Sequence, residues 1–219
     1  MPNSFDCIIV GGGGAGLAAA YSAACQGATV ALLERRPQPG GTTGIAVGSF
    51  TAAGTRWQRR AGIDDNPEDH DEDVSLFADP ELEARNNQPL RRFFLEHAAE
   101  TLHWLQEELR LNYVGPSPEP PNRCPRMHNV VPGAKAYVVR FQLALRRRGA
   151  TVITGAAVTR LLQENGRISG VEFSQDGKQH QLRARRGVVL ATGDYANNPE
   201  MIARYKGEEY RQIEGINPH

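Results

Sequence analysis

The sequence predicts an α/β fold with a parallel sheet, helices on one side of it and an antiparallel β-meander on the other. Residues 5–34 read as strand, helix and strand in succession. Residues 151–185 contain short strand patterns separated by Asn-Gly and Asp-Gly, the strongest hairpin signals, and residues 187–191 form another apolar run. With 219 residues and 40% hydrophobic content, the chain can bury a real core, and we treat residues 1–219 as one domain.

The first 34 residues form the clearest unit. Residues 5–10 are apolar and rich in Ile and Val, as expected of a strand buried on both faces. A glycine cluster follows, then a helical pattern over residues 16–26 with Gly27 as its C-terminal cap, and a second apolar run over residues 29–33. This order predicts a βαβ unit with parallel strands and a right-handed crossover.

The middle of the chain is predicted to be mainly helix and loop. Residues 37–56 lack periodicity and predict an ordered loop, whereas Asn66-Pro67 starts a helix. From Pro89 a second helix follows, with one apolar face formed by Leu90, Phe94, Ala98, Leu102, Leu105 and Leu109. Six prolines in residues 116–132 argue against a helix or a central strand there.

The last part returns to strands. A third helix is expected over residues 134–148. The strands that we expect after it cover residues 151–154, 156–164, 167–174, 179–185 and 187–191.

Charge and composition exclude several classes of protein. The formal net charge is zero, so no overall field recruits nucleic acid or anionic lipid, and the arginines at 146–148 and at 183, 185 and 186 are interpreted as solvated faces. Residues 61–110 carry fourteen acidic and four basic side chains and are interpreted as a solvated acidic helical segment. No apolar stretch approaches the roughly 18 residues of a membrane span.

Compartment and metal content are predicted from the same sequence. The N-terminal residues lack the pattern of an export signal, so a cytoplasmic location is expected. Cys7 and Cys25 are interpreted as small buried hydrophobes, while Cys124 has no assigned role. His70 lies among seven acids between Asp64 and Asp73, but no metal-binding spacing is present, and we expect no metal.

A glycine motif carries the chemistry. Gly11, Gly13 and Gly16 occupy the GxGxxG positions after a strand and at the start of a helix, where they allow the turn, the approach of a diphosphate and close helix–strand packing. Glu34 ends the second strand, where a carboxylate can accept both ribose hydroxyls of an adenosine. This combination predicts a Rossmann-like dinucleotide site. Glu34 disfavours the 2′-phosphate of NADP and leaves FAD and NAD open.

Further motifs resemble a family. Ala20 and Gly27 extend the glycine fingerprint toward that of FAD-containing oxidoreductases, and residues 187–193 resemble the second flavoprotein signature. Together with residues 40–43, 46–49, 66–69, 99–105 and 191–195, they resemble the flavoprotein subunits of the fumarate reductase, succinate dehydrogenase and 3-ketosteroid dehydrogenase group.

The resemblance implies FAD as the cofactor. Thr42 stands where respiratory members have a histidine bonded to the flavin, so non-covalent binding is implied, and Asp194 replaces a usual glycine. The FAD contacts implied by the resemblance are Gly11, Gly13, Gly14, Ala15, Gly16, Glu34, Arg35, Gly41, Thr42, Thr43, Gly48, Val158, Ala191, Thr192 and Gly193.

The resemblance also implies an oxidoreductase that moves a hydride between FAD and a carbon–carbon bond next to a carbonyl or carboxylate of a small-molecule substrate. Family members continue into a cap domain that is absent here, so we expect a fragment or a second polypeptide that supplies the rest. The catalytic residues cannot be assigned. Arg126 and His128 are the only substrate-side candidates, and a role in bracing the loop is favoured for both. An NAD-binding enzyme and a non-catalytic flavin-binding half remain as alternatives.

Overall fold

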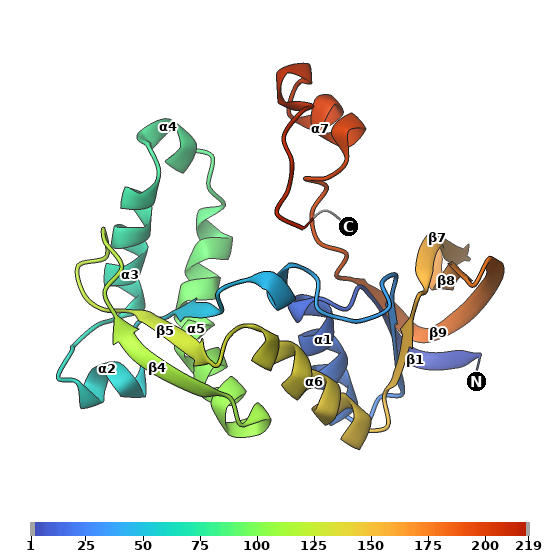
Figure 1. Cartoon of the computed structure of the whole chain (residues 1–219), viewed down its shortest axis with the longest axis horizontal. Coiled ribbons are helices and arrows are strands. Elements are labelled where there is room, and N and C mark those ends of the chain that lie inside the picture. Colours follow the sequence, from blue (N-terminus) through green and yellow to red (C-terminus); the bar gives the residue numbers. More distant parts are fainter. Residues whose placement is uncertain (1–2, 218–219) are drawn as a thin grey trace. The chain divides into compact units, whose positions relative to one another are not determined.

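The computed structural model describes residues 3–217 and divides them into two compact units (Figure 1). The first unit comprises residues 3–46 and 137–217, and the second comprises residues 47–136. The domain predicted over residues 1–219 includes both units, and its two residues at each end lie outside the described range.

The first unit is built on a six-stranded mixed sheet in the order β6-β2-β1-β9-β8-β7. Strand β1 (Ser4–Val10) pairs in parallel with β2 (Val30–Glu34) and with the end of β9 (Lys178–Leu190). Strand β2 in turn pairs in parallel with β6 (Thr151–Thr154). Ile8 therefore lies between Ala31 and Val188 in the register.

The antiparallel meander is continuous with this sheet. Strand β7 (Ala157–Glu164) pairs with β8 (Arg167–Gln175), which pairs with the first part of β9. The two strands predicted over residues 179–185 and 187–191 are one strand of 13 residues, which corrects the prediction. Arg183 pairs with Gly170 of β8 and with Ser4 of β1, so the two ladders overlap at this residue, and the register with β1 shifts between Phe5 and Cys7.

Helices and meander cover opposite faces of the parallel strands. Ile8, Val10 and Leu33 belong to a buried cluster that includes Val171 and Phe173 of the meander. Because side chains alternate along a strand, the remaining positions of β1 and β2 face helix α1 (Gly14–Cys25), and α6 (Lys135–Arg147) contacts α1. The rings of Tyr21 and Phe141, one from each helix, meet edge to face with centroids 6.1 Å apart. The predicted layer arrangement is confirmed.

The second unit contains a three-stranded antiparallel sheet in the order β3-β5-β4. Its strands are β3 (Ser49–Thr51), β4 (Asn112–Ser117) and β5 (Met127–Val131). The prediction that no central strand forms in residues 116–132 was wrong, because β5 is the central strand. The six residues between Pro125 and Pro132 contain no proline and retain every N–H that the ladder requires. Residues 37–56 also contain β3, rather than being loop throughout.

Two helices of the second unit, α3 and α5, begin within one residue of the predicted position, whereas α2 and α4 were not predicted. Asn66 caps α3 by accepting a hydrogen bond of 2.8 Å from the Asp69 N–H, with Pro67 as the first helical residue. Asn87 caps α5, where Leu95, Ala98, Leu102, Leu105 and Leu109 are buried. Leu90 and Phe94, predicted on the same buried face, are 62% and 55% exposed. The helices of this unit are α2 (Arg56–Arg60), α3 (Pro67–Val74), α4 (Pro80–Glu83) and α5 (Gln88–Leu109).

Short helices complete the described residues. They are α7 (Pro199–Tyr205) and three 3-10 helices, η1 (Thr42–Ile45), η2 (Ser75–Phe77) and η3 (Glu208–Tyr210). Within residues 3–217, no helix combines the length and apolar character needed to cross a membrane.

Candidate functional site

The turn between β1 and α1 requires glycine at two positions. Gly11 has φ +103°, and a Cβ there would lie 2.3 Å from the carbonyl oxygen of Ala191. A Cβ on Gly16 would lie 1.9 Å from the carbonyl oxygen of Gly11. Both contacts are with backbone, which cannot move aside, so the turn, the helix and the end of β9 can approach this closely only without side chains.

The start of α1 faces open space. Gly13 caps the helix without a side-chain hydrogen bond, and a Cβ added to it would meet nothing within 4 Å. The Gly14 N–H donates to the Thr43 hydroxyl at 3.1 Å, whereas the N–H groups of Ala15 and Gly16 belong to the first turn, where the helix itself supplies no acceptor. The positive end of the helix dipole and these donors fit a diphosphate.

Glu34 lies beside this turn. Its side chain is buried, with Oε2 accepting the Gly12 N–H at 2.7 Å and Oε1 accepting the Arg36 N–H at 2.9 Å. Each carboxylate oxygen can accept a second hydrogen bond, so both can still take a ribose hydroxyl. The structure thus places the carboxylate where the sequence predicts it.

Gly12 is a residue that the sequence analysis missed. A Cβ there would lie 2.9 Å from Glu34 Oε2 and 3.0 Å from Pro39 Cβ, and its carbonyl accepts the Gly40 N–H at 2.9 Å. Gly12 therefore ties Glu34 and the segment after β2 to the turn. The signal for this role was the unbroken run of four glycines, of which only alternate positions belong to the motif.

The segment after β2 folds back onto the turn. Gly41 has φ +50°, and a Cβ there would approach Gly13 Cα to 3.2 Å. Thr43 contacts Gly14 through its hydroxyl, and the adjacent Thr42 is exposed, with its own hydroxyl 3.4 Å from Asn217 Nδ2. The three predicted residues of this segment are therefore brought to the start of α1.

The end of β9 lies against the same turn. The Ala191 N–H donates to the Val10 carbonyl at 2.8 Å, and Thr192 Cα would lie 3.3 Å from a Cβ on Gly11. Gly193 follows with φ +80° and open space at its Cβ position. Asp194 is exposed, and its carboxylate accepts the Ala196 N–H at 2.8 Å.

Three further predicted residues lie outside these segments of the chain. Arg35 directly follows Glu34 and is exposed. Val158 stands on β7, two residues after Ala156, whose N–H donates to the Glu34 carbonyl at 2.9 Å. Gly48 belongs to the second unit, where a Cβ would approach Val130 Cγ1 to 2.6 Å. FAD contact by these three residues, as by the residues of the glycine turn and its neighbours, stays a prediction.

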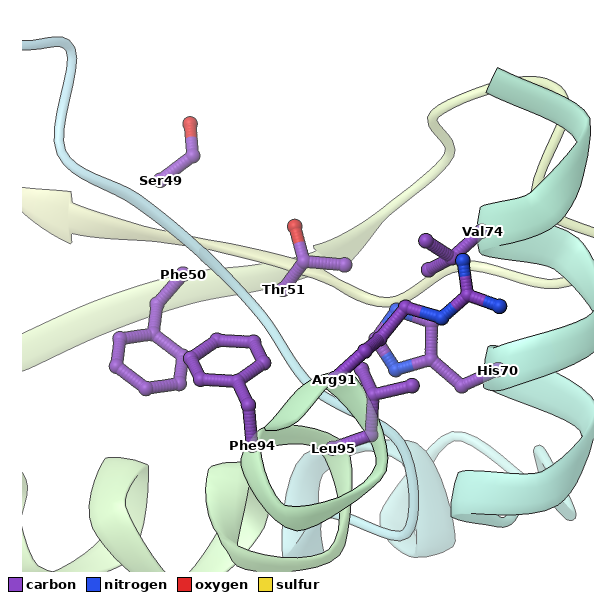
Figure 2. Close-up of a pocket in the computed structure, with 8 residues that line it drawn as sticks. All are labelled: Ser49, Phe50, Thr51, His70, Val74, Arg91, Phe94 and Leu95. Atoms are coloured by element: carbon purple, nitrogen blue, oxygen red, sulfur yellow. The ribbon is translucent and has the colours of Figure 1, made fainter. Parts of the chain in front are cut away.

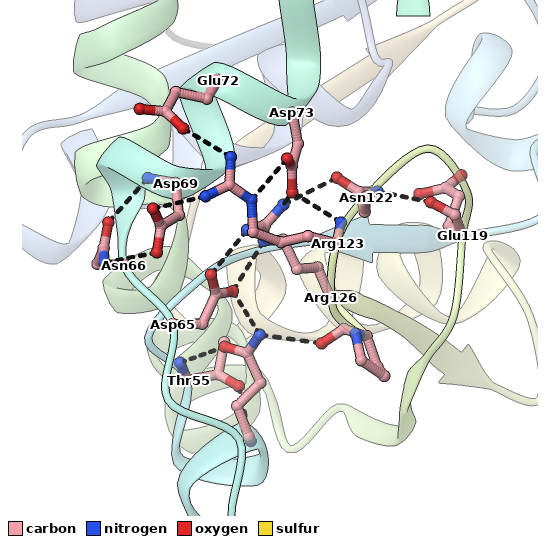
Figure 3. Close-up of polar contacts among 12 residues, drawn as sticks. Thr55, Asp65, Asn66, Asp69, Glu72, Asp73, Glu119, Asn122, Arg123 and Arg126 are labelled. Atoms are coloured by element: carbon pink, nitrogen blue, oxygen red, sulfur yellow. Dashed lines mark hydrogen bonds and ion pairs between the residues drawn. The ribbon is translucent and has the colours of Figure 1, made fainter. Parts of the chain in front are cut away.

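Arg126 is a structural brace. Its side chain is fully buried in the second unit, with Nη2 2.7 Å from Asp65 Oδ1 and Nη1 bonded to Asp73 Oδ2 (Figure 3). Burial raises the pKa of Asp73, but hydrogen bonds from Arg123 and Arg126 outweigh it and lower the pKa to about 2. The favoured bracing role is confirmed. The acidic segment is not solvated throughout, because Asp65 and Asp73 are buried partners of Arg126.

Two histidines belong to an aromatic cluster in the same unit. His128 is fully buried, with Nε2 3.1 Å from the Thr55 hydroxyl and its ring centroid 5.3 Å from that of Trp57. His103 accepts the Arg56 N–H at 3.2 Å, and its ring centroid lies 5.5 Å from that of Trp57. Burial lowers the pKa of both imidazoles, and the charge of Arg56 adds to the effect on His103.

Acid should therefore destabilise the second unit before its carboxylates titrate. In the folded state His70, His103 and His128 have a pKa below the ordinary value of 6.5, so the unfolded chain binds more protons below that pH. The stability that these three neutral imidazoles contribute is fully present above pH 6.5. It is lost as the pH falls toward about 4, the pKa of His70. Thermal melts at stepped pH values should show a falling Tm across this window. An exposed-site variant, His97→Gln, should melt with the same profile, and a constant Tm would contradict the prediction.

The cysteines differ from expectation in one case. Cys25 is exposed on α1 rather than buried, and Cys7 is half-buried. Burial and the nearby Asp65 raise the pKa of Cys124 to about 11, so its thiol stays protonated. In the described part of the chain no group of three His, Cys, Asp or Glu side chains is arranged to hold a metal.

Comparison with known proteins assigns the family. The model of the FAD binding domain family matches residues 6–213. The NADH:fumarate oxidoreductase of Klebsiella pneumoniae (strain 342) is 34% identical over 214 residues, covering 94% of this chain and 22% of that protein. The fumarate reductase (cytochrome) of Shewanella frigidimarina is 30% identical over 212 residues, covering 92% and 35%.

Solved structures agree with this assignment. The open conformation of a flavocytochrome c3 fumarate reductase aligns with a TM-score of 0.83 and 27% identity, over 93% of this chain and 36% of that one. The 3-ketosteroid-Δ4-(5α)-dehydrogenase of Rhodococcus jostii RHA1 aligns with a TM-score of 0.79 and 26% identity, over 92% and 48%. The chain thus spans between 22% and 48% of the length of these relatives. With nearly all of its residues matched by the family model and its glycine turn, Glu34 and β9 end assembled at one place, this chain belongs to the FAD-binding-domain family of flavin-dependent oxidoreductases.

Proposed function

We propose that this chain binds FAD non-covalently, as the FAD-binding part of an oxidoreductase acting on a carbon–carbon bond next to a carbonyl or carboxylate. The observation that carries the proposal is the open helix start at Gly13 beside the buried carboxylate of Glu34. Bound FAD supplies hydride transfer, while the protein supplies binding, orientation and electrostatics. The substrate and the catalytic residues are properties of the complete enzyme. Its cap domain would come from this polypeptide or from a second one.

Different residues of the first unit bind different parts of FAD. The N–H groups at the start of α1 bind the diphosphate, and Glu34 accepts the ribose hydroxyls. Ala191, Thr192 and Gly193 bring backbone to the same place from β9. Thr42 supports non-covalent binding, because a threonine hydroxyl offers no imidazole nitrogen for a bond to the flavin.

Gly13→Ala separates binding from folding. The added methyl group meets no protein atom within 4 Å, and the φ of −75° suits alanine, so the variant should keep the wild-type Tm. The methyl group would instead occupy the space proposed for the diphosphate, and we expect FAD affinity to fall at least about 10-fold. Flavin content after reconstitution and a thermal melt measure the two effects. Gly187→Ala, also in open space but away from the turn, is the matched control.

Reconstitution of the full chain tests the function itself. We expect a yellow protein that releases all of its flavin on acid precipitation, since no covalent bond holds it. Bound flavin should be reduced by dithionite, and turnover with fumarate or a 3-oxosteroid tests the reaction class. A colourless protein with nicotinamide affinity would instead support an NAD-binding enzyme. A yellow protein without turnover would support a flavin-binding half that needs a partner. A cytoplasmic location stays a prediction.

A further inference from the structure

The second unit contains a cavity that includes none of the predicted FAD-contact residues (Figure 2). Its volume is about 340 Å³, within the range of small-molecule sites in proteins. Its lining residues come from β3, the edge strand of the three-stranded sheet, and from helices α3 and α5. All of its lining residues belong to the second unit, so the cavity is complete within that unit.

The walls are mainly apolar. Phe50 of β3, Val74 of α3 and Leu95 and Phe94 of α5 line the space. Figure 2 shows the two phenyl rings on one side and His70, Val74 and Arg91 on the other. Leu95 is 3% exposed but Phe94 is 55% exposed, so Phe94 stands at the rim. Aromatic walls of this kind favour a flat, apolar molecule.

His70 supplies a polar group without a partner. The residue is 3% exposed and lines the cavity, and its Nδ1 is buried with no hydrogen-bond partner among residues 3–217. Burial, with a contribution from the charge of Arg126, lowers the pKa of His70 to about 4, so the imidazole is neutral near pH 7. A neutral imidazole has one donor and one acceptor nitrogen. Buried polar atoms normally have a partner, and Nδ1 would gain one if a rotation of the imidazole brought it to the cavity wall to meet a ligand oxygen.

Arg91 does not make the cavity a site for anions. Its side chain is 10% exposed, and it forms ion pairs with Asp71 Oδ1 at 2.6 Å and Glu83 Oε1 at 2.7 Å. Two carboxylates outweigh its single charge, and an anionic ligand would meet net negative charge. The hydroxyls of Ser49 and Thr51 already donate to side-chain oxygens within the same unit. His70 is therefore the polar group left to fix the orientation of a ligand.

We propose that this cavity binds an uncharged, mainly apolar small molecule with an aromatic ring, whose single hydroxyl or carbonyl oxygen forms a hydrogen bond with His70. The ring lies against Phe50 and Phe94, and the oxygen faces the imidazole. None of the residues that line the cavity is a predicted FAD contact, so its occupancy is expected without bound flavin.

Titration of the full chain with three probes tests the proposal. The probes are p-cresol, toluene, which has the same ring without the hydroxyl, and 4-methylbenzoate, which carries a negative charge. Amide resonances of residues 49–51, 70–74 and 91–95 should shift in NMR spectra, and p-cresol should bind about 5-fold more tightly than toluene, as expected for one hydrogen bond to a neutral group. The benzoate should bind more weakly than p-cresol.

Variants show whether His70 is responsible. His70→Leu should bind p-cresol and toluene equally and should fold well, because it removes a buried polar atom that has no partner. Phe94→Ala, at the exposed rim, should weaken both probes. His97→Leu, an exposed histidine on α5, should leave the p-cresol to toluene ratio unchanged. Equal binding of both probes to the wild type, shifts confined to other residues, or an unchanged ratio in His70→Leu would overturn the proposal. Flavin content, measured on the same samples, reports separately on the function proposed for the first unit.

Discussion

Replacing Glu34 with alanine is expected to weaken FAD binding by on the order of 100-fold, since it removes two hydrogen bonds to a charged acceptor. The carboxylate also holds the Gly12 N–H at 2.7 Å and the Arg36 N–H at 2.9 Å, so the variant loses the clamp that positions the turn. Both losses act on the ribose and diphosphate side of the site. Titration of the apo chain with FAD, followed by flavin fluorescence, measures the effect.

A matched control separates the site from general damage. Glu164→Ala removes an exposed carboxylate of the same unit, which pairs with Arg183, and should leave FAD affinity unchanged. Glu34→Gln keeps one acceptor oxygen but presents an NH₂ group to the second backbone N–H. Its affinity for FAD should lie between that of the wild type and that of Glu34→Ala. Wild-type flavin content in Glu34→Ala would count against the proposed adenosine position.

Replacing Arg126 with alanine is expected to lower the free energy of unfolding by about 3–5 kcal/mol, because it leaves the buried Asp65 carboxylate without its ion-pair partner and leaves Asp73 paired with Arg123 alone. Asp65 is 1% exposed and Asp73 is 3% exposed, and both lose their buried partner. Arg123 still contacts Asp73, but its side chain is 44% exposed, and no pairing of Arg123 with Asp65 is seen among the described residues. Arg126→Lys keeps the charge without the two-pronged geometry and should be intermediate.

Urea unfolding followed by tryptophan fluorescence measures this loss. The chain has two tryptophans, Trp57 and Trp104, and both lie in the second unit together with Arg126, so the signal reports on that unit. Arg92→Ala is the control, since Arg92 pairs with Glu68 and Glu96 at the surface, where ion pairs contribute little. A shift in the Arg126→Ala midpoint no larger than that of Arg92→Ala would refute the bracing role.

Local signals in the sequence predicted the phosphate-binding half of the site well. The βαβ unit is encoded by residues close together in the chain, and Gly11 and Gly16 of its motif stand where the close approach of backbone leaves no room for a Cβ. The position of Glu34 at the end of the second strand was predictable as well, because it belongs to the same local βαβ unit. The two hairpin turns carry their own signals, and the helix caps at Asn66 and Asn87 depend on neighbouring N–H groups.

Features that depend on distant partners were missed or misread. The continuity of β9 requires β1 and β8 to bind its two halves, and residues 178–190 alone do not show that. Strand β5 was dismissed because prolines flank it, although its pairing with β3 and β4 lies in its proline-free interior. Leu90 and Phe94 follow the helical period of α5, yet no described residue covers them fully. The periodicity of a sequence shows which face of a helix is apolar, but it does not show how far the neighbouring elements extend along that face.

The sequence by itself determined the nucleotide fold, the glycine turn and the acid that accompanies it, because each depends on backbone conformation and short-range spacing. Only the tertiary structure decided that Gly12 joins Glu34 to the turn, that Arg126 is a buried countercharge for Asp65 and Asp73, and that His70 faces a cavity. Those roles depend on burial and on partners up to 61 residues away, and the energy of a charged or polar group is set by its surroundings in space.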